Sequence, residues 1–540
     1  MSLIRSAALA AALVATWTAG ASAAPAPQPT VVRDVMTGRY TLGTEALSAT
    51  DDPIQDWIQP DTQIEPSIAV NPERPNNIVT AYQEGRIANG GDATNGFATS
   101  FDGGRSWISG ELPKLTHRVG QGGTWERASD AVVAFGPGNV VYANSLVFDQ
   151  NEESGLPSGI ATNVSKDGGR TWSAPVVFQD DNIGGLNDKN WIVVDQSDAP
   201  GHHKGRVYVV WDRVAPVVYN YCDHDCDQLA NWLPNLQTIP GLVFLGQGIG
   251  AYPVVMKDGG LGIVMNADSG GLPTTFGGEG EPDAALGEQV FSRAPAAGST
   301  PWPAPLAFLP PVDVASNQTN TVRAQRASDG LPAAAVDPDT GAVYAVWDDG
   351  RFRTDGANDA VISSSTDSGV TWSPATRVNP GPANDSVDHY NVTVAVPRKG
   401  VVQVAYRQRR EAASGQAQDF SPTIDTFFQE SRDGGATWSA PLRINSVPSY
   451  ALYDAFSRNG SFEGDYNQMA SAGGNTYVVR DQGQPLVAGE PPALSPSGAT
   501  VVLTAAGKGH QHQRTWVALI RDTKPRHAAL RRRHRSRARR

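Results

Sequence analysis

The stretch "ATSFDGGRSW" at residues 98–107 contains a Ser-x-Asp-x-Gly-x-Ser/Thr-Trp pattern that recurs along the chain. The other clear copies are "SKDGGRTW" (165–172), "STDSGVTW" (365–372) and "SRDGGATW" (431–438). Their tryptophans stand 65, 200 and 66 residues apart, so we expect degenerate copies within the long central gap. One is "FSRAPAAGSTPWPAP" (291–305). A fixed period of this length predicts a repeat architecture.

Paired apolar segments accompany the motif. Each pair has short alternating stretches separated by a turn rich in Gly, Pro, Asn or Asp, which predicts two β-strands. Seven such pairs occur, at 66–86, 131–146, 191–213, 252–268, 333–351, 391–409 and 466–482. Together with the 56 glycines and 39 prolines, they predict an all-β chain. We expect a β-propeller of four-stranded blades, with seven blades favoured and six as the alternative.

The motif itself is predicted to be structural. Strands alternate in direction within a blade, so the motif turn lies at the end opposite the loops that enter each first strand. We expect the aspartate to accept backbone hydrogen bonds, the glycine to adopt positive φ and the tryptophan to pack between neighbouring sheets. The residues given this role are Ser100, Asp102, Gly104, Trp107, Ser165, Asp167, Gly169, Trp172, Ser365, Asp367, Gly369, Trp372, Ser431, Asp433, Gly435 and Trp438.

The two ends of the chain differ from its centre. Residues 1–23 combine Arg5, an apolar stretch and the small residues Ala21-Ser22-Ala23, which is typical of a secretory signal peptide. We therefore expect a secreted, extracellular protein. The predicted organisation is a signal peptide (1–23), an N-terminal extension (24–59), a propeller (60–521) and a basic disordered tail (522–540).

The formal net charge of −12 is unevenly distributed, because residues 521–540 hold ten Lys or Arg against one Asp. The rest of the chain is strongly acidic, which argues against nucleic acid as a partner of the folded body. The tail could contact an anionic wall polymer or stay solvated without a partner. We expect a monomer.

Only two cysteines occur, Cys222 and Cys226 in "YCDHDCDQ". A local disulfide is the expected state in an oxidising compartment. Asp223, Asp225 and Asp227 alternate in the same stretch and could supply oxygen ligands to a structural Ca²⁺, although such a site needs further ligands from elsewhere. No other metal or cofactor is expected.

With its repeated motif, the chain resembles the sialidase superfamily, whose Asp boxes have this sequence. The resemblance extends from about residue 60 to 445 and implies a β-propeller. Asp boxes also occur in propellers without sialidase activity, so the motif points to architecture more than to function.

In "TAYQEGRIANGGDATNGFATSFDGGRSW", Arg86 matches the arginine that binds a substrate carboxylate and Asp92 matches the general acid. In "SFEGDYNQMASAGGNTYVVRD", Tyr466 is similar to the nucleophilic tyrosine, with Glu463 or Asp465 as its base.

One departure from the family pattern concerns the first inner strand. Sialidases carry an Arg-Ile-Pro element there, whereas this chain has "TQIEPSIAV", with Ile64 and Glu65 in place of the arginine. A carboxylate at this position would repel the carboxylate of sialic acid. Strict sialidase activity is therefore in question even with the fold expected.

The leading hypothesis is a secreted glycoside hydrolase of sialidase-like build that acts on extracellular glycans, with exo-α-sialidase activity as one option. Asp92, Tyr466 and Glu463 are its catalytic candidates and Arg86 its substrate clamp. For a neutral sugar, Asp92 and Asp388 could instead form an acid and base pair. The alternative class is a non-catalytic propeller that binds glycan or protein at the cell surface. The other candidate substrate-binding residues are Glu65, Asp130, Asp188, Arg326, Arg351, Asp388, Tyr390 and Arg407.

Overall fold

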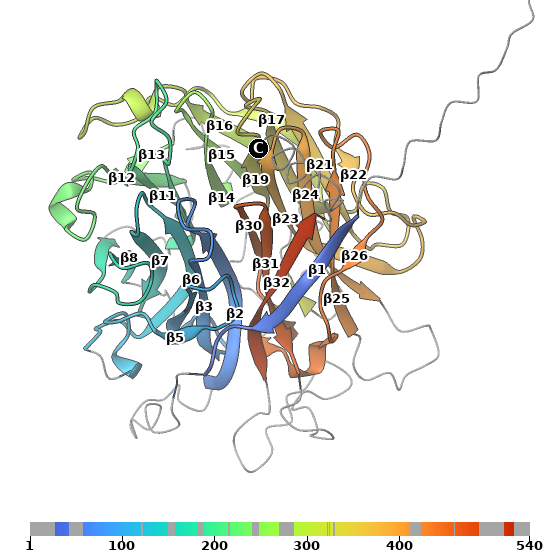
Figure 1. Ribbon diagram of the computed structural model, residues 1–540, viewed down its shortest axis with the longest axis horizontal. Coiled ribbons are helices and arrows are strands. Elements are labelled where there is room, and N and C mark those ends of the chain that lie inside the picture. The colour runs from blue at the N-terminus through green and yellow to red at the C-terminus, as the bar shows by residue number, and fades with distance from the viewer. Residues whose placement is uncertain are drawn as a thin grey trace, which may run out of the picture. The chain divides into compact units, whose positions relative to one another are not determined.

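The computed structural model is built from β-strands (Figure 1), so the predicted all-β class is confirmed. It describes residues 28–40, 42, 58–119, 122–149, 157–180, 187–213, 217–239, 248–268, 286–320, 322, 325–327, 330–410, 423–457, 460–484 and 512–522. Pro29–Arg521 form one compact unit. A second unit comprises residues 1–28 and 522–540, of which only Gln28 and Asp522 are described, so the predicted signal peptide and basic tail lie outside the described residues. Among the described helices, none is long and apolar enough to cross a membrane.

The described residues form six four-stranded antiparallel meanders that follow one another along the chain, and single residue pairings join the first two of them to each other and to the last sheet. The first contains β2 (Ile58–Val70), β3 (Ile78–Ile87), β4 (Asp92–Ser100) and β5 (Ile108–Glu111), paired in chain order. Each of the next five repeats this meander. Their strands are β6 (Arg127–Phe135), β7 (Val141–Phe148), β8 (Ser158–Ser165), β9 (Val176–Asp180); β10 (Asn187–Val194), β11 (Val207–Arg213), β12 (Val218–Cys222), β13 (Gln237–Thr238); β14 (Gly248–Val255), β15 (Leu261–Asp268), β16 (Leu286–Ala294), β17 (Val312–Gln318); β19 (Ala333–Val336), β20 (Val343–Asp349), β21 (Asp359–Ser365), β22 (Thr376–Arg377); and β23 (Val387–Arg398), β24 (Val401–Arg410), β25 (Thr423–Ser431), β26 (Leu442–Arg443).

The last sheet draws strands from both ends of the chain. β30 (Gln468–Ala472), β31 (Asn475–Gly483) and β32 (Gln513–Asp522) form a meander, and β1 (Pro29–Met36) adds to it beside β32. β1 lies within the predicted N-terminal extension (24–59) and belongs to the same compact unit as the predicted propeller. An uncovered β32 would present unpaired backbone groups, and β1 covers that edge.

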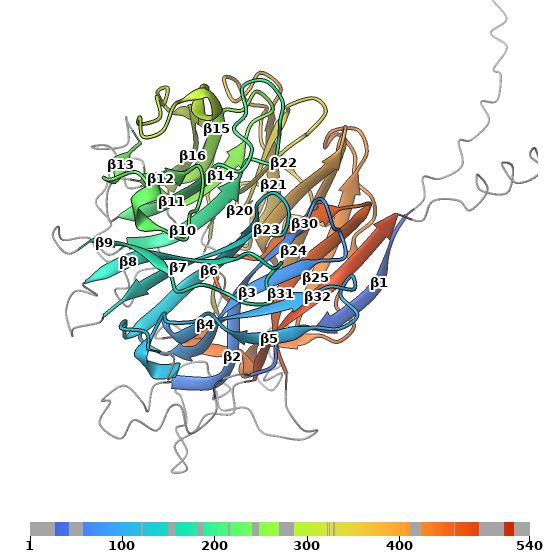
Figure 2. The same cartoon turned by 60° about the vertical axis from the view of Figure 1, so that its left-hand side comes forward.

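The seven predicted strand pairs are all present as the first two strands of these sheets. The first strands also contact one another in sequence. The contacts run from β2 through β6, β10, β14, β19 and β23 to β30, which contacts β2 again (Figures 1 and 2). Apolar side chains of adjacent sheets fill the interfaces, as in the cluster that joins Phe97 and Ala81 to Val133 and Phe135. This arrangement brings the beginnings of the first strands together.

The four Asp boxes have the same geometry. In each one, the serine hydroxyl donates to the aspartate and accepts the N–H of the glycine four residues after it, as Ser165 does with Asp167 and Gly169 at 2.8 Å each. The hydrogen bond from the Thr371 hydroxyl, with further bonds from the turn, lowers the pKa of Asp367 to about 2. The turn thus satisfies its own serine hydroxyl and aspartate carboxylate.

Two of the box tryptophans pack on an aromatic ring of the preceding sheet. Trp172, which follows β8, lies 5.5 Å from Phe97 of β4 between ring centroids. Trp372, which follows β21, lies 5.4 Å from Phe291 of β16. Each box is therefore a clasp between neighbouring sheets.

The Asp boxes lie at the opposite end of the sheets from Arg86 and Asp92. In the hairpin of β3 and β4, Ile78 pairs with Ser100 at one end and Arg86 with Asp92 at the other. Eight strand residues separate these ends, or about 26 Å at the usual rise per residue. The boxes cannot share a site with Asp92.

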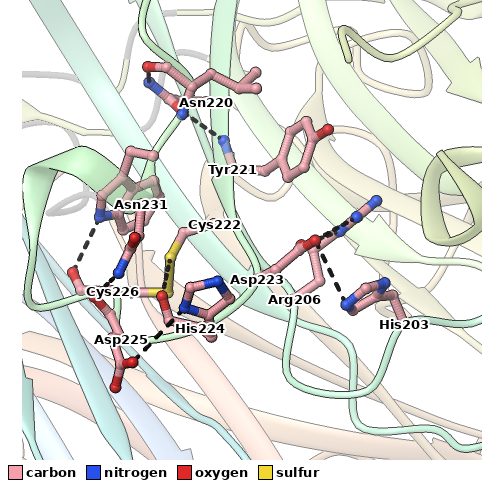
Figure 3. The surroundings of a disulfide bond; sticks show 12 residues. His203, Arg206, Asn220, Tyr221, Cys222, Asp223, His224, Asp225, Cys226 and Asn231 are labelled. Atoms are coloured by element: carbon pink, nitrogen blue, oxygen red, sulfur yellow. Dashed lines mark hydrogen bonds and ion pairs between the residues drawn. A yellow bond between two sulfur atoms is a disulfide. The ribbon is translucent and has the colours of Figure 1, made fainter. Parts of the chain in front are cut away.

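Cys222 and Cys226 form a disulfide in the turn after β12 (Figure 3). The neighbouring carboxylates have separate partners. Asp223 accepts from Arg206 at 2.5 and 2.8 Å, Asp227 pairs with Lys166 at 2.7 Å, and Asp225 lies 3.7 Å from His224. They do not converge on one centre, and the described part of the chain holds no group of three metal-ligating side chains. The Ca²⁺ site considered from the sequence is not supported.

We predict that β1 contributes strongly to stability through Asp34. Its carboxylate accepts two hydrogen bonds from Arg480 at 2.8 and 2.9 Å, and both side chains are buried. Asp34→Ala would leave a buried guanidinium without its carboxylate, at a cost of about 3 kcal/mol in the free energy of unfolding. Val32→Ala on the same strand is the matched control, because Val32 is 45% exposed. The measurement is the free energy of unfolding from chemical denaturation. An equal loss of that free energy in Asp34→Ala and Val32→Ala would contradict this role of Asp34.

Candidate active site

A bulge with left-handed backbone interrupts five of the first strands. Register shifts occur in β2, β6, β10, β14 and β23. A bulge of this kind bends the strand and redirects side chains, and a non-glycine residue with positive φ carries strain. The residues at these positions are Glu65 (φ 49°), Asp130 (47°), Lys189 (46°), Gly250 (72°) and Asn391 (50°).

Tyr466 lies at the centre of the charged groups that these bulges present. It is buried, and the ammonium of Lys189 lies 3.4 Å from the centroid of its ring. Its hydroxyl has no hydrogen-bond partner among the described residues. Burial raises the pKa of Tyr466 well above its ordinary value, and so do the charges of Glu65, Asp130, Asp465 and Asp92. Four carboxyl groups therefore lie within electrostatic reach of a phenol that stays protonated.

Asp92 and Arg86 are brought together as the sequence suggested. Asp92 is the first residue of β4 and pairs with Arg86 of β3 and Ala128 of β6, so it lies where two sheets meet. The guanidinium Nη1 is 3.4 Å from the carboxylate Oδ2, and both side chains are buried. Burial raises the pKa of Asp92 to about 7, with Glu65 adding to the shift and Arg86 opposing it. Asp92 can therefore carry a proton at neutral pH.

Glu65 is held by the segment that contains Tyr466. Its carboxylate accepts the side-chain amide of Gln83 and, at 2.9 Å, the backbone N–H of Asp465. A Cβ on Gly464 would lie 2.6 Å from the Cγ of Glu65, so a glycine is needed for this close approach. Desolvation raises the pKa of Glu65 well above its usual range, followed by the charge of Asp130.

Asp465 is paired with Arg326 on the other side of the same segment. Arg326 Nη2 lies 2.7 Å from Asp465 Oδ2, and Asp465 Oδ1 has no hydrogen-bond partner in the described part of the chain. Arg326 comes from the short β18 (Gln325–Arg326), which pairs with β29 (Gly460–Phe462) outside the seven sheets. The guanidinium groups of Arg326 and Arg86 lie 4.3 and 4.6 Å from the ring of Phe462. Phe462–Tyr466 thus contact all of these groups.

Asp130 and Asp188 face Lys189. Burial raises the pKa of Asp130 to about 7, with the charge of Asp188 as the next cause. Burial also lowers the pKa of Lys189, against the charges of Asp130 and Glu65. The group contains more carboxyl groups than cations, so several of them compete for protons near neutral pH.

A small pocket opens beside Tyr466. Its walls come from the first strands of several sheets, and Asp465 and Lys189 are its charged residues. Trp191 and Tyr252 are in contact at 4.5 Å between centroids, and Trp191 meets Tyr466 edge-on at 5.3 Å. The pocket is lined by Lys189, Trp191, Tyr252, Leu331, Pro332, Ala333, Asn391, Val392, Asp465, Tyr466 and Asn467.

Glu463 is not paired with Tyr466, contrary to the interpretation from the sequence. Its carboxylate accepts the hydroxyl of Tyr390 at 2.7 Å and pairs with Arg407 Nη1 at 2.7 Å. Arg407 also pairs with Asp481. Glu463 and Tyr466 lie on either side of Gly464, whose left-handed φ of 87° changes the direction of the chain between them. Tyr390, Glu463 and Arg407 form a buried network beside the pocket.

Two other candidates are engaged with the β19–β22 sheet. Arg351 is bound to Asp349 and not to the group around Tyr466: its Nε donates to Asp349 Oδ1 at 2.9 Å. Asp388 accepts the backbone N–H of Asn358 at 2.8 Å. The structure therefore offers no support for an acid and base pair of Asp92 and Asp388.

Trp191 and Tyr252 are pocket residues that the sequence interpretation missed. Each stands two residues after the left-handed residue of its strand, at Lys189 and Gly250. Tyr466 stands two residues after Gly464 in the same way. Aligning the first strands on this position, instead of on the Asp boxes, would have grouped the three aromatic residues.

No family model matches the chain, and no curated protein matches it. Similar solved structures include the phage phi92 endosialidase, with 11% identity, a TM-score of 0.44 and coverage of 88% of this chain and 68% of that one. Another is the GH93 α-L-arabinofuranosidase of Fusarium graminearum with arabinobiose, with 11% identity, a TM-score of 0.41 and coverage of 70% and 92%. The NanB sialidase of Streptococcus pneumoniae has 10% identity, a TM-score of 0.40 and coverage of 90% and 71%.

In an ordinary strand an alanine variant is more stable than a glycine variant. We predict that the left-handed conformation at Lys189 reverses this order of stability. Lys189→Gly and Lys189→Ala remove the same charge, but only alanine retains a Cβ at a φ of 46°. The glycine variant should be more stable by about 1 kcal/mol in denaturant unfolding. Ala143→Gly is the control at a regularly paired strand residue, and there glycine should destabilise by at least 0.5 kcal/mol, roughly the usual strand cost. If the alanine variant were as stable as the glycine variant, the backbone at residue 189 would not be strained for a residue with a Cβ.

Proposed function

We propose that the protein is a glycoside hydrolase that acts on an extracellular glycan. The observation that carries the proposal is Asp92, a buried carboxyl with a pKa raised to about 7 beside Arg86 and within the charged group around Tyr466. A glycosidase needs one protonated carboxyl to donate to the leaving oxygen and one ionised carboxylate on the other side of the bond. The resemblance of residues 80–107 to the sialidase pattern supports the same residue as the acid.

Asp465 is the proposed ionised partner of Asp92. It forms an ion pair with Arg326, lines the pocket and keeps one carboxylate oxygen without a hydrogen bond to any described residue. In this scheme Asp92 protonates the glycosidic oxygen as the bond to the sugar carbon breaks. Asp465 either attacks that carbon or takes a proton from the attacking water.

The sequence instead favoured Tyr466 as nucleophile. A phenol must lose its proton to attack, and burial, together with the charges of nearby carboxyl groups, holds the pKa of Tyr466 well above the ordinary value. Its hydroxyl also lacks a hydrogen bond to a base among the described residues. We therefore assign Tyr466 a binding role and leave nucleophilic attack by tyrosine as an outcome of the experiments below.

We also propose that the seven sheets are the blades of a seven-bladed propeller. The contacts between first strands return from β30 to β2, and Thr62 of β2 pairs with Gln513 of β32. β1 would then join the N-terminal end of the chain to the last blade. Secretion is proposed from the sequence of residues 1–23, and the disulfide fits an oxidising compartment.

A non-catalytic glycan-binding propeller is the second candidate. Glu65 stands where sialidases carry the first arginine of their substrate clamp, which favours a site altered from that of an active sialidase. Binding to a glycan array without hydrolysis of any glycoside would establish this second function and overturn the first.

We predict that the loss of activity in Asp92→Asn depends on the leaving group of the substrate. An aryl glycoside with a poor leaving group needs the acid, so kcat/KM should fall about 10³-fold. A dinitrophenyl glycoside departs without a proton and should be hydrolysed at a rate within about tenfold of the parent. Asp198→Asn is the matched control, because that side chain is 76% exposed and lies in the β10–β11 turn. Uniform loss on both substrates in Asp92→Asn would remove Asp92 from the role of acid.

Asp465→Asn and Tyr466→Phe distinguish the two attack mechanisms in the same assay. The proposed mechanism requires a large fall in kcat for Asp465→Asn and mainly an increase in KM for Tyr466→Phe. The reverse pattern would restore Tyr466 as the nucleophile.

We predict that activity falls as the pH rises through about 7. Asp92 must be protonated to act as an acid, and its folded pKa is about 7, so the active fraction decreases tenfold per pH unit above that value. The measurement is the pH profile of kcat/KM on an aryl glycoside. In Asp92→Asn, assayed on the dinitrophenyl glycoside, this alkaline decline should disappear. A decline that persists there would assign it to another group, with Asp130 as the next candidate.

A further inference from the structure

The turns that follow three of the first strands are each linked to the corresponding turn of the next sheet. Asn71 follows β2, and its side-chain amide donates to the carbonyl of Gly138 in the β6–β7 turn at 2.9 Å. Asp337 follows β19, and its carboxylate accepts the N–H of Gly400 in the β23–β24 turn at 2.8 Å. In both of these links a donor faces an acceptor, so the two turns are joined directly.

The third link, between the β10–β11 turn and the β14–β15 turn, runs through His202. Asp195 follows β10 and its carboxylate lies 2.8 Å from His202 Nδ1, while His202 Nε2 lies 3.0 Å from the carbonyl oxygen of Lys257. The side chains of His202 and Asp195 are 7% and 0% exposed. The two turns are in close contact, because a Cβ on Gly259 would overlap the carbonyl of Gly201. The ring of His202 therefore bridges the third sheet (β10–β13) and the fourth (β14–β17).

Both partners of the His202 ring are hydrogen-bond acceptors. A backbone carbonyl has no proton to donate, and the Asp195 carboxylate also accepts the backbone N–H groups of Ser197 at 3.0 Å and His203 at 2.8 Å. A neutral imidazole carries one N–H, whereas an imidazolium carries two. Only the protonated ring can therefore donate to Asp195 and to the Lys257 carbonyl at the same time.

The groups around His202 favour its protonated form. Burial by itself lowers the pKa of His202, but the hydrogen bonds to Asp195 and to the carbonyl of Lys257, with the charge of Asp258, raise it above the ordinary value. The other titratable and charged groups on the elements that pack here have partners of their own (Figure 3): Lys204 with Asp198, His203 and Arg206 with Asp223, Arg293 with Asp258, and the Lys257 ammonium with the carbonyl of Asp339.

We propose that His202 is a proton-dependent link between the third and fourth sheets. As an imidazolium it donates from Nδ1 to Asp195 and from Nε2 to the Lys257 carbonyl. When the ring loses a proton to water, the Asp195 carboxylate retains the one on Nδ1, so the hydrogen bond that breaks is the one between the sheets. The neutral ring then presents a lone pair to the Lys257 carbonyl, and the β14–β15 turn is released.

The link should be complete at acidic pH and should weaken as the pH rises. The pKa of His202 is raised in the folded protein, so its contribution to stability is fully present below the ordinary value of about 6.5 and is lost as the pH rises through the raised value. The link involves neither a substrate nor the residues around Tyr466. It can therefore be tested whether or not the protein proves to be a hydrolase.

Amide hydrogen exchange of the full-length protein, expressed as protection factors, tests the link. Between about pH 6 and about pH 9 the protection of residues 256–260 should fall about tenfold, as expected for the loss of one charge-assisted hydrogen bond. Residues 399–400 are the internal reference, because they are held by carboxylates. Despite burial, hydrogen bonds such as that from Gly400 lower the pKa of Asp337, so protection there should stay constant. An equal fall in both segments, or no fall at 256–260, would overturn the inference.

His202→Gln and a matched control assign the pH dependence to this ring. Glutamine does not titrate, so the fall at residues 256–260 should disappear in His202→Gln. His117→Gln replaces an exposed histidine and should retain it. A fall of the parent's size in His202→Gln would overturn the inference.

Nuclear magnetic resonance of the parent keeps the inference testable if His202→Gln does not fold. With ¹³C-labelled histidine, one of the nine histidines of the chain should titrate above the ordinary value of about 6.5. The absence of any such resonance would overturn it.

Discussion

The candidate site depends on a left-handed residue placed at the same point of successive first strands. Glycine adopts this conformation without strain, but Glu65, Asp130, Lys189 and Asn391 adopt it with a Cβ. Each such residue costs about 1 kcal/mol or more, and strain of this kind persists only where packing and hydrogen bonds enforce it. The bulges direct one charged or polar side chain from each of several strands towards Tyr466. Regular strands would alternate their side chains and could not present these neighbours together.

The resulting concentration of charge is balanced locally. Arg86 pairs with Asp92, Arg326 pairs with Asp465, and Lys189 lies among the remaining carboxyl groups. Burying so many carboxyl groups is unfavourable unless some are protonated, and the raised pKa values of Asp92 and Asp130 follow from this condition. The same burial that costs stability produces groups able to exchange protons near neutral pH. Stability and the proposed chemistry therefore have one physical origin here.

The sequence was sufficient for the repeat, because Asp boxes and alternating strands are local patterns. Each hydrogen bond of the Ser165–Asp167 clasp joins residues at most four positions apart, so its form can be predicted from a short stretch. The role of β1 could not be predicted in this way, since its partner β32 lies almost five hundred residues further along the chain. Glu463 was misassigned for a related reason. Its proximity to Tyr466 in sequence suggested a pair, but the left-handed Gly464 separates them and Tyr390 of another sheet donates to Glu463 instead.

The two ends of the sheets differ in how their polar groups are hydrogen-bonded. This difference explains why the most conspicuous motif is not the candidate site. An Asp box satisfies its serine hydroxyl and its aspartate carboxylate from within its own turn. The other end leaves Tyr466 Oη, Asp92 Oδ1 and Asp465 Oδ1 without hydrogen-bond partners among the described residues. Unsatisfied polar atoms in a buried, charged pocket are costly unless a bound molecule completes them. A ligand that supplied these missing partners would recover part of that cost, which is the physical reason for placing the candidate site at this end.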